Sequence, residues 1–184
     1  MTVELICVGT ELLLGNIVNT NAAYLSEKCA LLGLSMYYQS VVGDNPGRLA
    51  SLLETAKGRS DIIILCGGLG PTQDDLTKET AALAMGRTMV EDKKAREDLE
   101  RYLSRNHYPI TENNWKQAMV PEGSTVLYNA NGTAPGIMIK GDKNTMILLP
   151  GPPNELIPMF EEQVYPYLHS LQQEVICSKM IKLC

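Results

Sequence analysis

The sequence has no run of lysine or arginine, no apolar stretch long enough to cross a membrane, and only two histidines. With 16 basic against 21 acidic residues and a net charge of −5, it lacks the basic track that a nucleic-acid backbone requires. Its N-terminus has no positively charged region of the kind found in signal peptides. We therefore expect a cytoplasmic protein that binds neither nucleic acid nor a membrane.

Cysteine is also too scattered to indicate a metal site. The five cysteines show neither paired metal-ligand spacing nor a disulfide framework, and two of them fall inside apolar runs. We expect reduced core residues, as in a cytosolic protein. With 184 residues and 45% hydrophobic content, the chain can bury a full core without covalent cross-links. The cysteines are Cys7, Cys29, Cys66, Cys177 and Cys184.

Short apolar runs alternate with helical patterns through the first third of the sequence. The apolar runs cover residues 3–8, 34–42 and 61–66, and patterns with one apolar face lie between them. This alternation predicts right-handed βαβ crossovers and a mainly parallel sheet with helices on both faces. Residues 136–140 and 145–149 bracket a Gly-Asp-Lys-Asn turn, which predicts a β-hairpin that adds an antiparallel edge. The expected fold class is therefore α/β.

Several helix starts can be read directly. Asn19 or Thr20 is expected to cap one helix, and Asp44-Asn45-Pro46 begins another with proline in its first turn. Residues 91–105 predict a charged helix with a solvated face, and residues 111–119 predict a further short helix.

One domain is expected over residues 1–170. Residues 171–184 have the character of a linker or of the start of a following segment. The stretch from Val175 begins another strand-like pattern and ends on apolar residues. We therefore expect that a longer protein, with a second domain, continues beyond it.

Residues 66–80, CGGLGPTQDDLTKET, predict a strand, a glycine-rich turn and a helix. The glycines allow positive φ and a close approach of the backbone to a ligand. Exposed amides in such a turn, together with the first turn of a helix, bind phosphate oxygens well. Thr72 is expected to cap this helix. Its buried face is expected to include Leu76, Leu83 and Ala84.

Two adjacent carboxylates, Asp74 and Asp75, stand beside this turn and are expected in the first turn of the helix. Alone they would repel a phosphate. A divalent cation resolves the conflict, because Mg²⁺ takes one or two carboxylates and leaves its other positions to water and phosphate oxygens. The alternative is that both acids only cap the helix.

A third acid is expected close by. The first strand ends at Gly9-Thr10-Glu11, and ligands of parallel sheets bind beyond the carboxyl ends of the strands. If the first and third strands are neighbours, Glu11 and Asp75 converge on one crevice.

Two later segments also have the character of ligand-facing loops. Residues 129–136 show neither helical nor strand periodicity, and residues 150–156 form a proline-rich turn that opens a helix. A stiff turn of this kind holds a ligand-facing loop without an entropic cost at binding. The alternative is a plain connector between strand and helix.

Four motifs follow one another in the chain: GTELLLGNIVNTN at 9–21, GGLGPTQDDLTKE at 67–79, NGTAPG at 131–136 and LPGPPNEL at 149–156. This series closely resembles the N-terminal domain of the CinA family, competence/damage-inducible proteins related to the molybdopterin-binding domains of molybdenum-cofactor biosynthesis. The resemblance covers nearly the whole chain. It implies a three-layer α/β/α sandwich, a nucleotide- or pterin-phosphate site at the strand ends, and a homo-oligomer, either dimer or trimer.

The resemblance also bears on activity. Some CinA-family N-terminal domains are described as metal-dependent ADP-ribose pyrophosphatases, whereas the second domain of full-length members is a nicotinamide-mononucleotide deamidase. That second domain is absent from these residues, so deamidase activity is not expected of this chain. In the related molybdenum-insertion enzymes, acids matching Glu11 and Asp75 are functionally important. Those relatives usually keep one acid where this chain has Asp74-Asp75, a departure that favours a second metal contact over pterin chemistry.

Our first hypothesis is hydrolysis of the pyrophosphate bond of ADP-ribose or a similar nucleotide diphosphate, with Mg²⁺ or another divalent cation. Asp75, Asp74 and Glu11 are the candidate catalytic residues, and the two aspartates are the candidate metal ligands. No histidine lies in the motifs, so a carboxylate or a metal-activated water must serve as base. The candidate substrate contacts are Thr10, Gly67, Gly68, Leu69, Gly70, Thr72, Asn131, Gly132, Thr133, Gly151, Pro152 and Asn154.

Two other hypotheses stay open, because one fold supports many chemistries. The first is that the chain is a molybdopterin-binding protein of the adenylyltransferase kind, which uses the same turn with an adenylyl donor. The second is that it is a non-catalytic domain that binds a nucleotide and mediates dimerisation.

Overall fold

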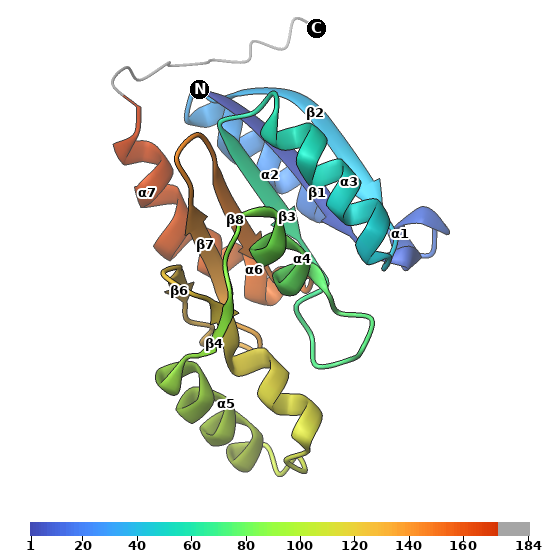
Figure 1. Cartoon of the computed structure of the whole chain (residues 1–184), viewed down its shortest axis with the longest axis vertical. Coiled ribbons are helices and arrows are strands. Elements are labelled where there is room, and N and C mark those ends of the chain that lie inside the picture. Colours follow the sequence, from blue (N-terminus) through green and yellow to red (C-terminus); the bar gives the residue numbers. More distant parts are fainter. Residues whose placement is uncertain (173–184) are drawn as a thin grey trace, which may run out of the picture.

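The computed structural model of the chain describes residues 1–172 (Figure 1). The strand-like stretch from Val175, most of the expected linker at 171–184, and Cys177 and Cys184 lie outside the described residues. Within residues 1–172, no helix is both long enough and apolar enough to cross a membrane.

The centre of the molecule is a six-stranded sheet in the order β2-β1-β3-β8-β7-β6. Four neighbours, β2, β1, β3 and β8, run parallel, and β7 runs antiparallel to both β8 and β6. The predicted hairpin is confirmed as β7 and β8, with β6 completing the antiparallel edge. The bounds are β1 Thr2–Val8, β2 Ser35–Val42, β3 Ile62–Cys66, β6 Thr125–Leu127, β7 Gly136–Lys140 and β8 Thr145–Leu149.

Helices cover both faces of the sheet, which confirms the predicted three layers (Figure 1). One core joins the sheet to α2 (Thr20–Leu31), α6 (Pro153–Met159) and the segment that follows α6. The other core joins the opposite face to α3 (Pro46–Lys57) and α4 (Thr77–Ala84). The central strands are buried on both faces for this reason, and all five residues of β3 are buried.

Local sequence signals explain the first helices well. The Asn19 side chain accepts a hydrogen bond from the Ala22 amide at 3.1 Å, and Asn45 accepts one from the Arg48 amide at 3.0 Å. Each satisfies an amide that has no partner inside its helix. Pro46 lies in the first turn of α3, as predicted.

After α6 the chain continues as a π-helical turn, η2 (Phe160–Val164), and then as α7 (Tyr165–Ser170). Pro158 lies inside α6 and Pro166 in the first turn of α7, so two proline rings interrupt the regular α-helical bonding on either side of η2. The turn still buries Phe160 and Val164 in the first core.

The buried face of α4 differs from the prediction. Leu83 is 78% exposed, whereas Ala81 and Ala82 are buried. Small side chains on this helix allow a close approach to α3 and to the sheet, so the bulky leucine faces solvent. Apolar periodicity over eight residues was too short to identify the face.

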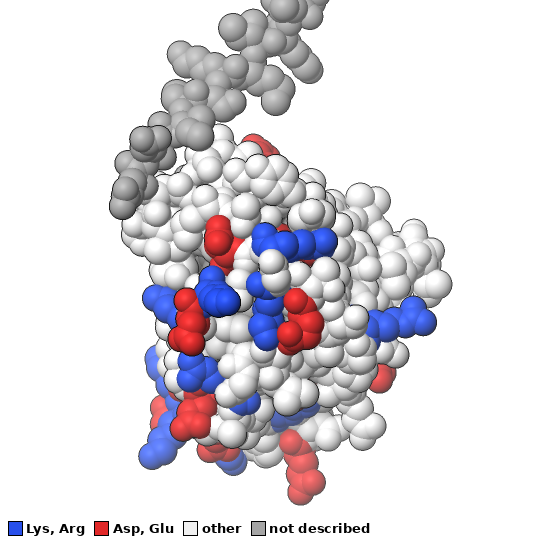
Figure 2. All heavy atoms as spheres, turned by 45° about the horizontal axis from the view of Figure 1, so that its top comes forward, with Lys and Arg blue, Asp and Glu red and all other residues white. Residues whose placement is uncertain are grey.

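A small lobe follows α4, at the bottom of Figure 1. It consists of the antiparallel pair β4 (Met89–Glu91) and β5 (Met119–Pro121), helix α5 (Lys93–Arg105) and the 3-10 helix η1 (Glu112–Ala118). The predicted charged helix and the predicted short helix are thereby confirmed. On the face of the molecule drawn in Figure 2, acidic and basic side chains are interspersed, without a basic track.

A buried lysine attaches this lobe to the sheet domain. Lys78 is 1% exposed, and its Nζ donates hydrogen bonds to the carbonyls of Lys116, Gln117 and Met119 at 3.0, 2.9 and 2.8 Å. Three carbonyl oxygens satisfy the three N–H groups of an ammonium. The end of η1 is therefore fixed against the start of α4.

Candidate functional site

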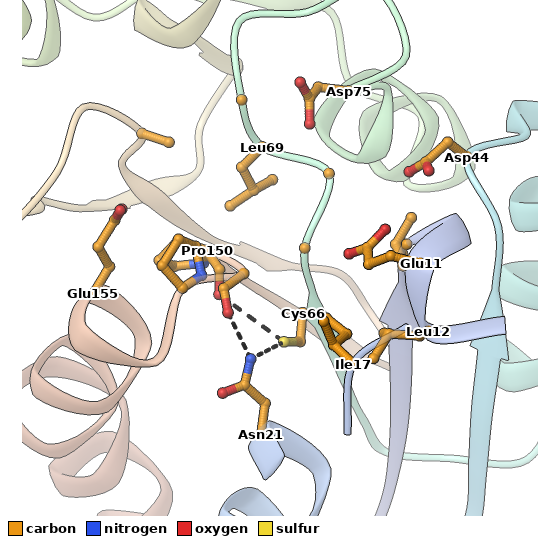
Figure 3. A pocket seen from close by; sticks show the side chains of 18 of the residues that line it. Glu11, Leu12, Ile17, Asn21, Asp44, Cys66, Leu69, Asp75, Pro150 and Glu155 are labelled. Atoms are coloured by element: carbon orange, nitrogen blue, oxygen red, sulfur yellow. Dashed lines mark hydrogen bonds between the residues drawn. The ribbon is translucent and has the colours of Figure 1, made fainter. Parts of the chain in front are cut away.

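A cavity of about 670 Å³ lies beyond the carboxyl ends of β1, β3 and β8 (Figure 3). Segments from all of the four motifs line it. Glu11 and Asp75 both face this cavity, because β1 and β3 are parallel neighbours. The expected convergence of the two acids on one crevice is thus found, at the edge of the sheet where α/β proteins bind ligands.

The glycine turn forms the middle of the cavity wall. Gly67 and Gly68 have φ values of 101° and 69°, which a residue with a Cβ rarely adopts. The amide of Gly67 donates to the carbonyl of Leu149 at 3.0 Å and so ties the turn to β8. Within residues 1–172, the amides of Gly68, Leu69 and Gly70 donate to no protein acceptor. Three amides without a protein acceptor therefore belong to residues that line the cavity, as in turns that bind anions.

Gly67→Ala should distort this turn. A Cβ at this position would overlap the Val8 carbonyl oxygen, and the positive φ adds its own strain. We expect the free energy of unfolding to fall by about 3 kcal/mol in urea denaturation. Gly86→Ala is the control, because Gly86 has φ 63° with open space around it, and about 1 kcal/mol is expected there. Equal losses in the two variants would contradict the close contact with Val8.

The acidic loop after the turn is not helical, which corrects the prediction. Helix α4 begins at Thr77 with Leu76 in the cap position, so Asp74 and Asp75 precede it. Thr72 does not cap the helix. Instead its amide and hydroxyl donate to Asp75 Oδ2 at 3.0 and 2.5 Å.

A second lysine contacts this loop. Lys116 Nζ donates to the carbonyls of Thr72 and Asp75, and the Thr72 carbonyl also accepts a turn hydrogen bond from the Asp75 amide at 3.3 Å. Asp75 is half-buried at the cavity, while Asp74 also reaches the cavity but is exposed.

Glu11 lies on the opposite side of the glycine turn from Leu69 (Figure 3). Its carboxylate packs over Gly9, where a Cβ would meet Oε1 at 2.5 Å. Within the described part of the chain, the Glu11 side chain has no hydrogen-bond partner. The neighbouring Thr10 is engaged, since its amide and hydroxyl donate to Asp44 Oδ2 at 3.0 and 2.8 Å. Among the described residues, the Glu11 carboxylate is therefore free to contact a ligand, as is that of the exposed Asp74.

Glu155 was missed by the sequence prediction, although it lies in the LPGPPNEL motif. It enters the cavity from the first turn of α6, and its Oε2 accepts a hydrogen bond from Asn129 Nδ2 at 2.6 Å. Burial raises the pKa of Glu155 above its ordinary value, while the Asn129 amide lowers it by a smaller amount. Acids are common in the first turn of a helix, so the position of Glu155 in the sequence did not by itself indicate a role in the site.

Asn21 and Cys66 were also missed. Asn21 Nδ2 donates to Cys66 Sγ at 3.2 Å and to the Gly151 carbonyl at 2.6 Å, which joins α2, β3 and the proline-rich turn (Figure 3). Cys66 is the register partner of Cys7 on β1. A hydrogen bond with Cys66 lowers the pKa of Cys7 to about 7, while that bond and burial raise the pKa of Cys66. Cys7, Cys29 and Cys66 are free and buried, as predicted.

The structure brings most of the predicted site residues to one cavity, and leaves a few outside its lining. Asn131 and Asn154 bond to each other, with Asn131 Nδ2 donating to the Asn154 carbonyl at 2.9 Å. The predicted residues that line the cavity are Glu11, Gly67, Gly68, Leu69, Gly70, Thr72, Asp74, Asp75, Thr133, Gly151 and Pro152. Those that do not are Thr10, Asn131, Gly132 and Asn154.

The charged side chains that line the cavity are all acidic among the described residues. Five carboxylates line it, and none of the described lining residues is lysine or arginine. An anionic ligand would need a cation to offset this field. In residues 1–172, no group of three or more His, Cys, Asp or Glu side chains has the geometry of a metal site. The acids therefore fit a cation only as one or two ligands, with phosphate oxygens and water supplying the rest. The carboxylates are Glu11, Asp44, Asp74, Asp75 and Glu155.

Comparisons with known proteins show the family to which the chain belongs. The family described as "Probable molybdopterin binding domain" matches residues 4–170. The chain is 56% identical over 180 residues to a protein of Thermoanaerobacter pseudethanolicus named "Putative competence-damage inducible protein", covering 98% of this chain and 44% of that protein. A protein of the same name in Clostridium beijerinckii is 48% identical over 183 residues, covering 100% of this chain and 45% of that protein. The chain thus spans less than half the length of these relatives.

Solved structures are similar too. The crystal structure of CinA from Thermoplasma acidophilum, a protein described as of unknown function, has a TM-score of 0.80 and 30% identity, covering 90% of this chain and 96% of that one. The molybdopterin biosynthesis enzyme MoaB of Thermus thermophilus has a TM-score of 0.60 and 20% identity, with 92% and 94% covered. The second similarity concerns the fold alone.

Proposed function

This chain belongs to the CinA proteins within the molybdopterin-binding domain family, and from that membership and its cavity we propose that it binds a nucleotide or pterin phosphate and hydrolyses a pyrophosphate bond. The proposed substrate is ADP-ribose or a similar nucleotide diphosphate, with Mg²⁺ or another divalent cation. The observation that supports it most is the combination of unpaired turn amides with carboxylates in one cavity.

The amides of Gly68, Leu69 and Gly70 would hold one phosphate group. They are fixed in place because the Gly67 amide is bonded to β8 and the Thr77 amide to the Gly68 carbonyl, at 3.0 and 3.2 Å. Preorganised donors of this kind stabilise charge as it develops on phosphoryl oxygens. No rearrangement of the turn is then needed during the reaction.

Asp75, with Asp74 and Glu11 at the same cavity, would supply the carboxylate oxygens for the cation. When bound, a divalent cation polarises phosphoryl oxygens and increases the acidity of water. The carboxylate oxygen of Glu11 that does not hold the cation would accept the proton of the attacking water, because no side chain or amide in the described part of the chain bonds to it. The described lining residues include no histidine that could take this role.

The direct test is product analysis. ADP-ribose incubated with the protein and Mg²⁺ should yield AMP and ribose 5-phosphate, and EDTA should abolish their release, because no lysine or arginine in the described cavity lining can replace the cation. Chromatography of the nucleotides measures both outcomes. Product release that persists in EDTA, or no release with any divalent metal, would refute the proposed reaction.

The matched family model favours one alternative enough to include it in the same experiment. Incubation with molybdopterin and ATP would give adenylylated pterin if the chain is a transferase of the adenylyltransferase kind. Calorimetric binding of ADP-ribose without any product would instead support a non-catalytic nucleotide-binding domain.

A further inference from the structure

Two cysteines lie side by side in the sheet, next to the cavity. Cys7 and Cys66 are register partners on the parallel neighbours β1 and β3, and both side chains belong to the core that packs against α2. Neighbouring strands of a sheet lie about 4.7–4.9 Å apart, which is within the range of Cα separations that a disulfide bridges. A hydrogen bond already joins the two sulfurs. The pair is therefore placed to form an S–S bond without a large movement of the strands.

Of the two cysteines, Cys66 is the one that reaches the cavity. It belongs to the cavity wall, whereas Cys7 is not among the described lining residues, and the two side chains are 4% and 1% exposed. Figure 3 shows Cys66 at the end of β3, where its Sγ accepts a hydrogen bond from Asn21 Nδ2 at 3.2 Å. A small oxidant that enters the cavity therefore meets the sulfur of Cys66 first.

The hydrogen bond between the sulfurs gives them different roles. With Cys66 as the donor, it lowers the pKa of Cys7 to about 7, although burial opposes this effect. The same bond and burial both raise the pKa of Cys66. Near neutral pH, Cys7 is thus partly a thiolate, whereas Cys66 keeps its proton unless a base removes it. Cys7 is positioned to be that base, because it already accepts the Cys66 proton in a hydrogen bond.

We propose that Cys7 and Cys66 form an oxidation site at which hydrogen peroxide converts the two thiols into a reversible disulfide. Cys66 passes its proton to Cys7, and the Cys66 thiolate attacks one oxygen of the peroxide. The O–O bond breaks, and the leaving hydroxide takes the proton from Cys7, so that one water departs and Cys66 becomes a sulfenic acid. The Cys7 thiolate then attacks the Cys66 sulfur, the S–O bond breaks, and the second hydroxide leaves as water with a proton from solvent. Each sulfur is oxidised by one electron, and the peroxide is reduced to two waters.

The disulfide would alter the cavity wall through Asn21. The Asn21 Nδ2 donates both to Cys66 Sγ and to the Gly151 carbonyl, at 3.2 and 2.6 Å, and so joins the start of α2 to the proline-rich turn. Forming the S–S bond moves Cys66 Sγ towards Cys7, so its contact with Asn21 changes. The oxidation state of the pair is thereby coupled to a segment that lines the cavity.

Differential alkylation of the whole chain tests the site. The protein is treated with hydrogen peroxide, its remaining thiols are blocked, and it is digested with trypsin, with and without dithiothreitol. Because trypsin cleaves after lysine and arginine, Cys7, Cys29 and Cys66 fall on three separate peptides. Mass spectrometry should find the Cys7 peptide linked to the Cys66 peptide, and dithiothreitol should restore both thiols.

Cys29 is the internal control for rate. It is 0% exposed on α2, and burial raises its pKa to about 12. The link between Cys7 and Cys66 should therefore form at least about tenfold faster than Cys29 is oxidised in the same sample.

Serine variants assign the two roles. Cys66→Ser should leave Cys7 reduced, because Cys7 does not belong to the described cavity wall. Cys7→Ser should remove the base, so that Cys66 is oxidised at least about tenfold more slowly. Cys29→Ser is the matched control and should leave the rate of linking unchanged. Thermal unfolding checks that each variant is folded, and the result with the unaltered chain does not depend on any of them.

The coupling to the cavity wall has its own measurement. In nitrogen–proton correlation spectra, the side-chain amide signal of Asn21 should shift when the pair is oxidised. The side-chain amide of Asn129 is the control and should not shift, because it bonds to Ala134 and Glu155, away from either sulfur.

The oxidation site is overturned if Cys7 and Cys66 are oxidised no faster than Cys29, or if Cys66 links to Cys177 or Cys184 instead. It is also overturned if oxidation stops at an oxygen adduct of Cys66 without a link to Cys7. An unchanged Asn21 signal in the linked protein would overturn the coupling to the cavity wall. These outcomes are independent of the proposed hydrolysis, because none of the measurements uses a nucleotide.

Discussion

Asp75→Asn should lower the metal-dependent turnover of ADP-ribose by about 10²- to 10³-fold, or about 3–4 kcal/mol in activation free energy. The substitution removes the negative charge that would bind the cation. Asparagine keeps an oxygen that can still accept from the Thr72 amide and hydroxyl, so the loop conformation should survive. Initial rates at saturating Mg²⁺ and substrate measure the effect.

Two control variants separate the metal from the loop. Asp74→Asn changes the adjacent exposed acid and should cost less than tenfold, since Asp74 is not tied to the loop. Thr72→Val removes the hydroxyl donor to Asp75 but keeps the amide donor, so a loss as large as that of Asp75→Asn would indicate a purely structural role. Full activity of Asp75→Asn would contradict the assignment of the cation to this acid.

Glu4→Ala should reduce the free energy of unfolding by about 3–5 kcal/mol, measured by urea denaturation. Glu4 is fully buried in β1, and Arg59 binds it in a bidentate manner, with Nε to Oε2 at 3.0 Å and Nη2 to Oε1 at 2.7 Å. Ser60 Oγ donates to Oε2 at 3.0 Å, and the guanidinium stacks on Tyr38 at 3.6 Å from the ring centroid. Removing the carboxylate leaves the buried Ser60 hydroxyl without its acceptor, and leaves the guanidinium, which is 32% exposed, with water and the Tyr38 ring.

Substituting Glu4 and Arg59 singly and together tests whether the two side chains act as a pair. Arg59→Met alone should be about as damaging, because it leaves an uncompensated buried charge, whereas Glu4→Met combined with Arg59→Met should recover much of the loss. Lys94→Met is the surface control, since its ion pair with Asp98 is exposed and should contribute below about 1 kcal/mol. Additive losses in the double variant would show that the two side chains do not act as a pair.

Much of the fold followed from the sequence, because periodicity and capping are local. The apolar runs predicted the parallel strands. The caps at Asn19 and Asn45 indicated where the crossover helices begin. The convergence of Glu11 and Asp75 followed from chain order, because strand ends of a parallel sheet share one edge. These inferences needed no knowledge of distant contacts.

What the sequence could not provide depends on distant contacts. The non-helical loop before α4 is held by hydrogen bonds from Lys116, about forty residues later, and no sequence pattern near residue 74 indicates those contacts. Gln117 lines the cavity for the same kind of reason, since Lys78 fixes its backbone. The exposure of Leu83 follows from the packing of α4 on α3. In each case tertiary structure overrides the local propensity.

The contacts of Lys78 and Lys116 between the lobe and the sheet domain also bear on folding. The Lys116 bonds to the carbonyls of Thr72 and Asp75 can form only once the lobe lies against the sheet domain, an arrangement that the Lys78 bonds stabilise. Both contacts span roughly forty residues, so closing these chain loops is slow compared with forming a single helix. The acidic loop should therefore be among the last parts of the molecule to become native, and the first to lose protection against hydrogen exchange when the lobe detaches.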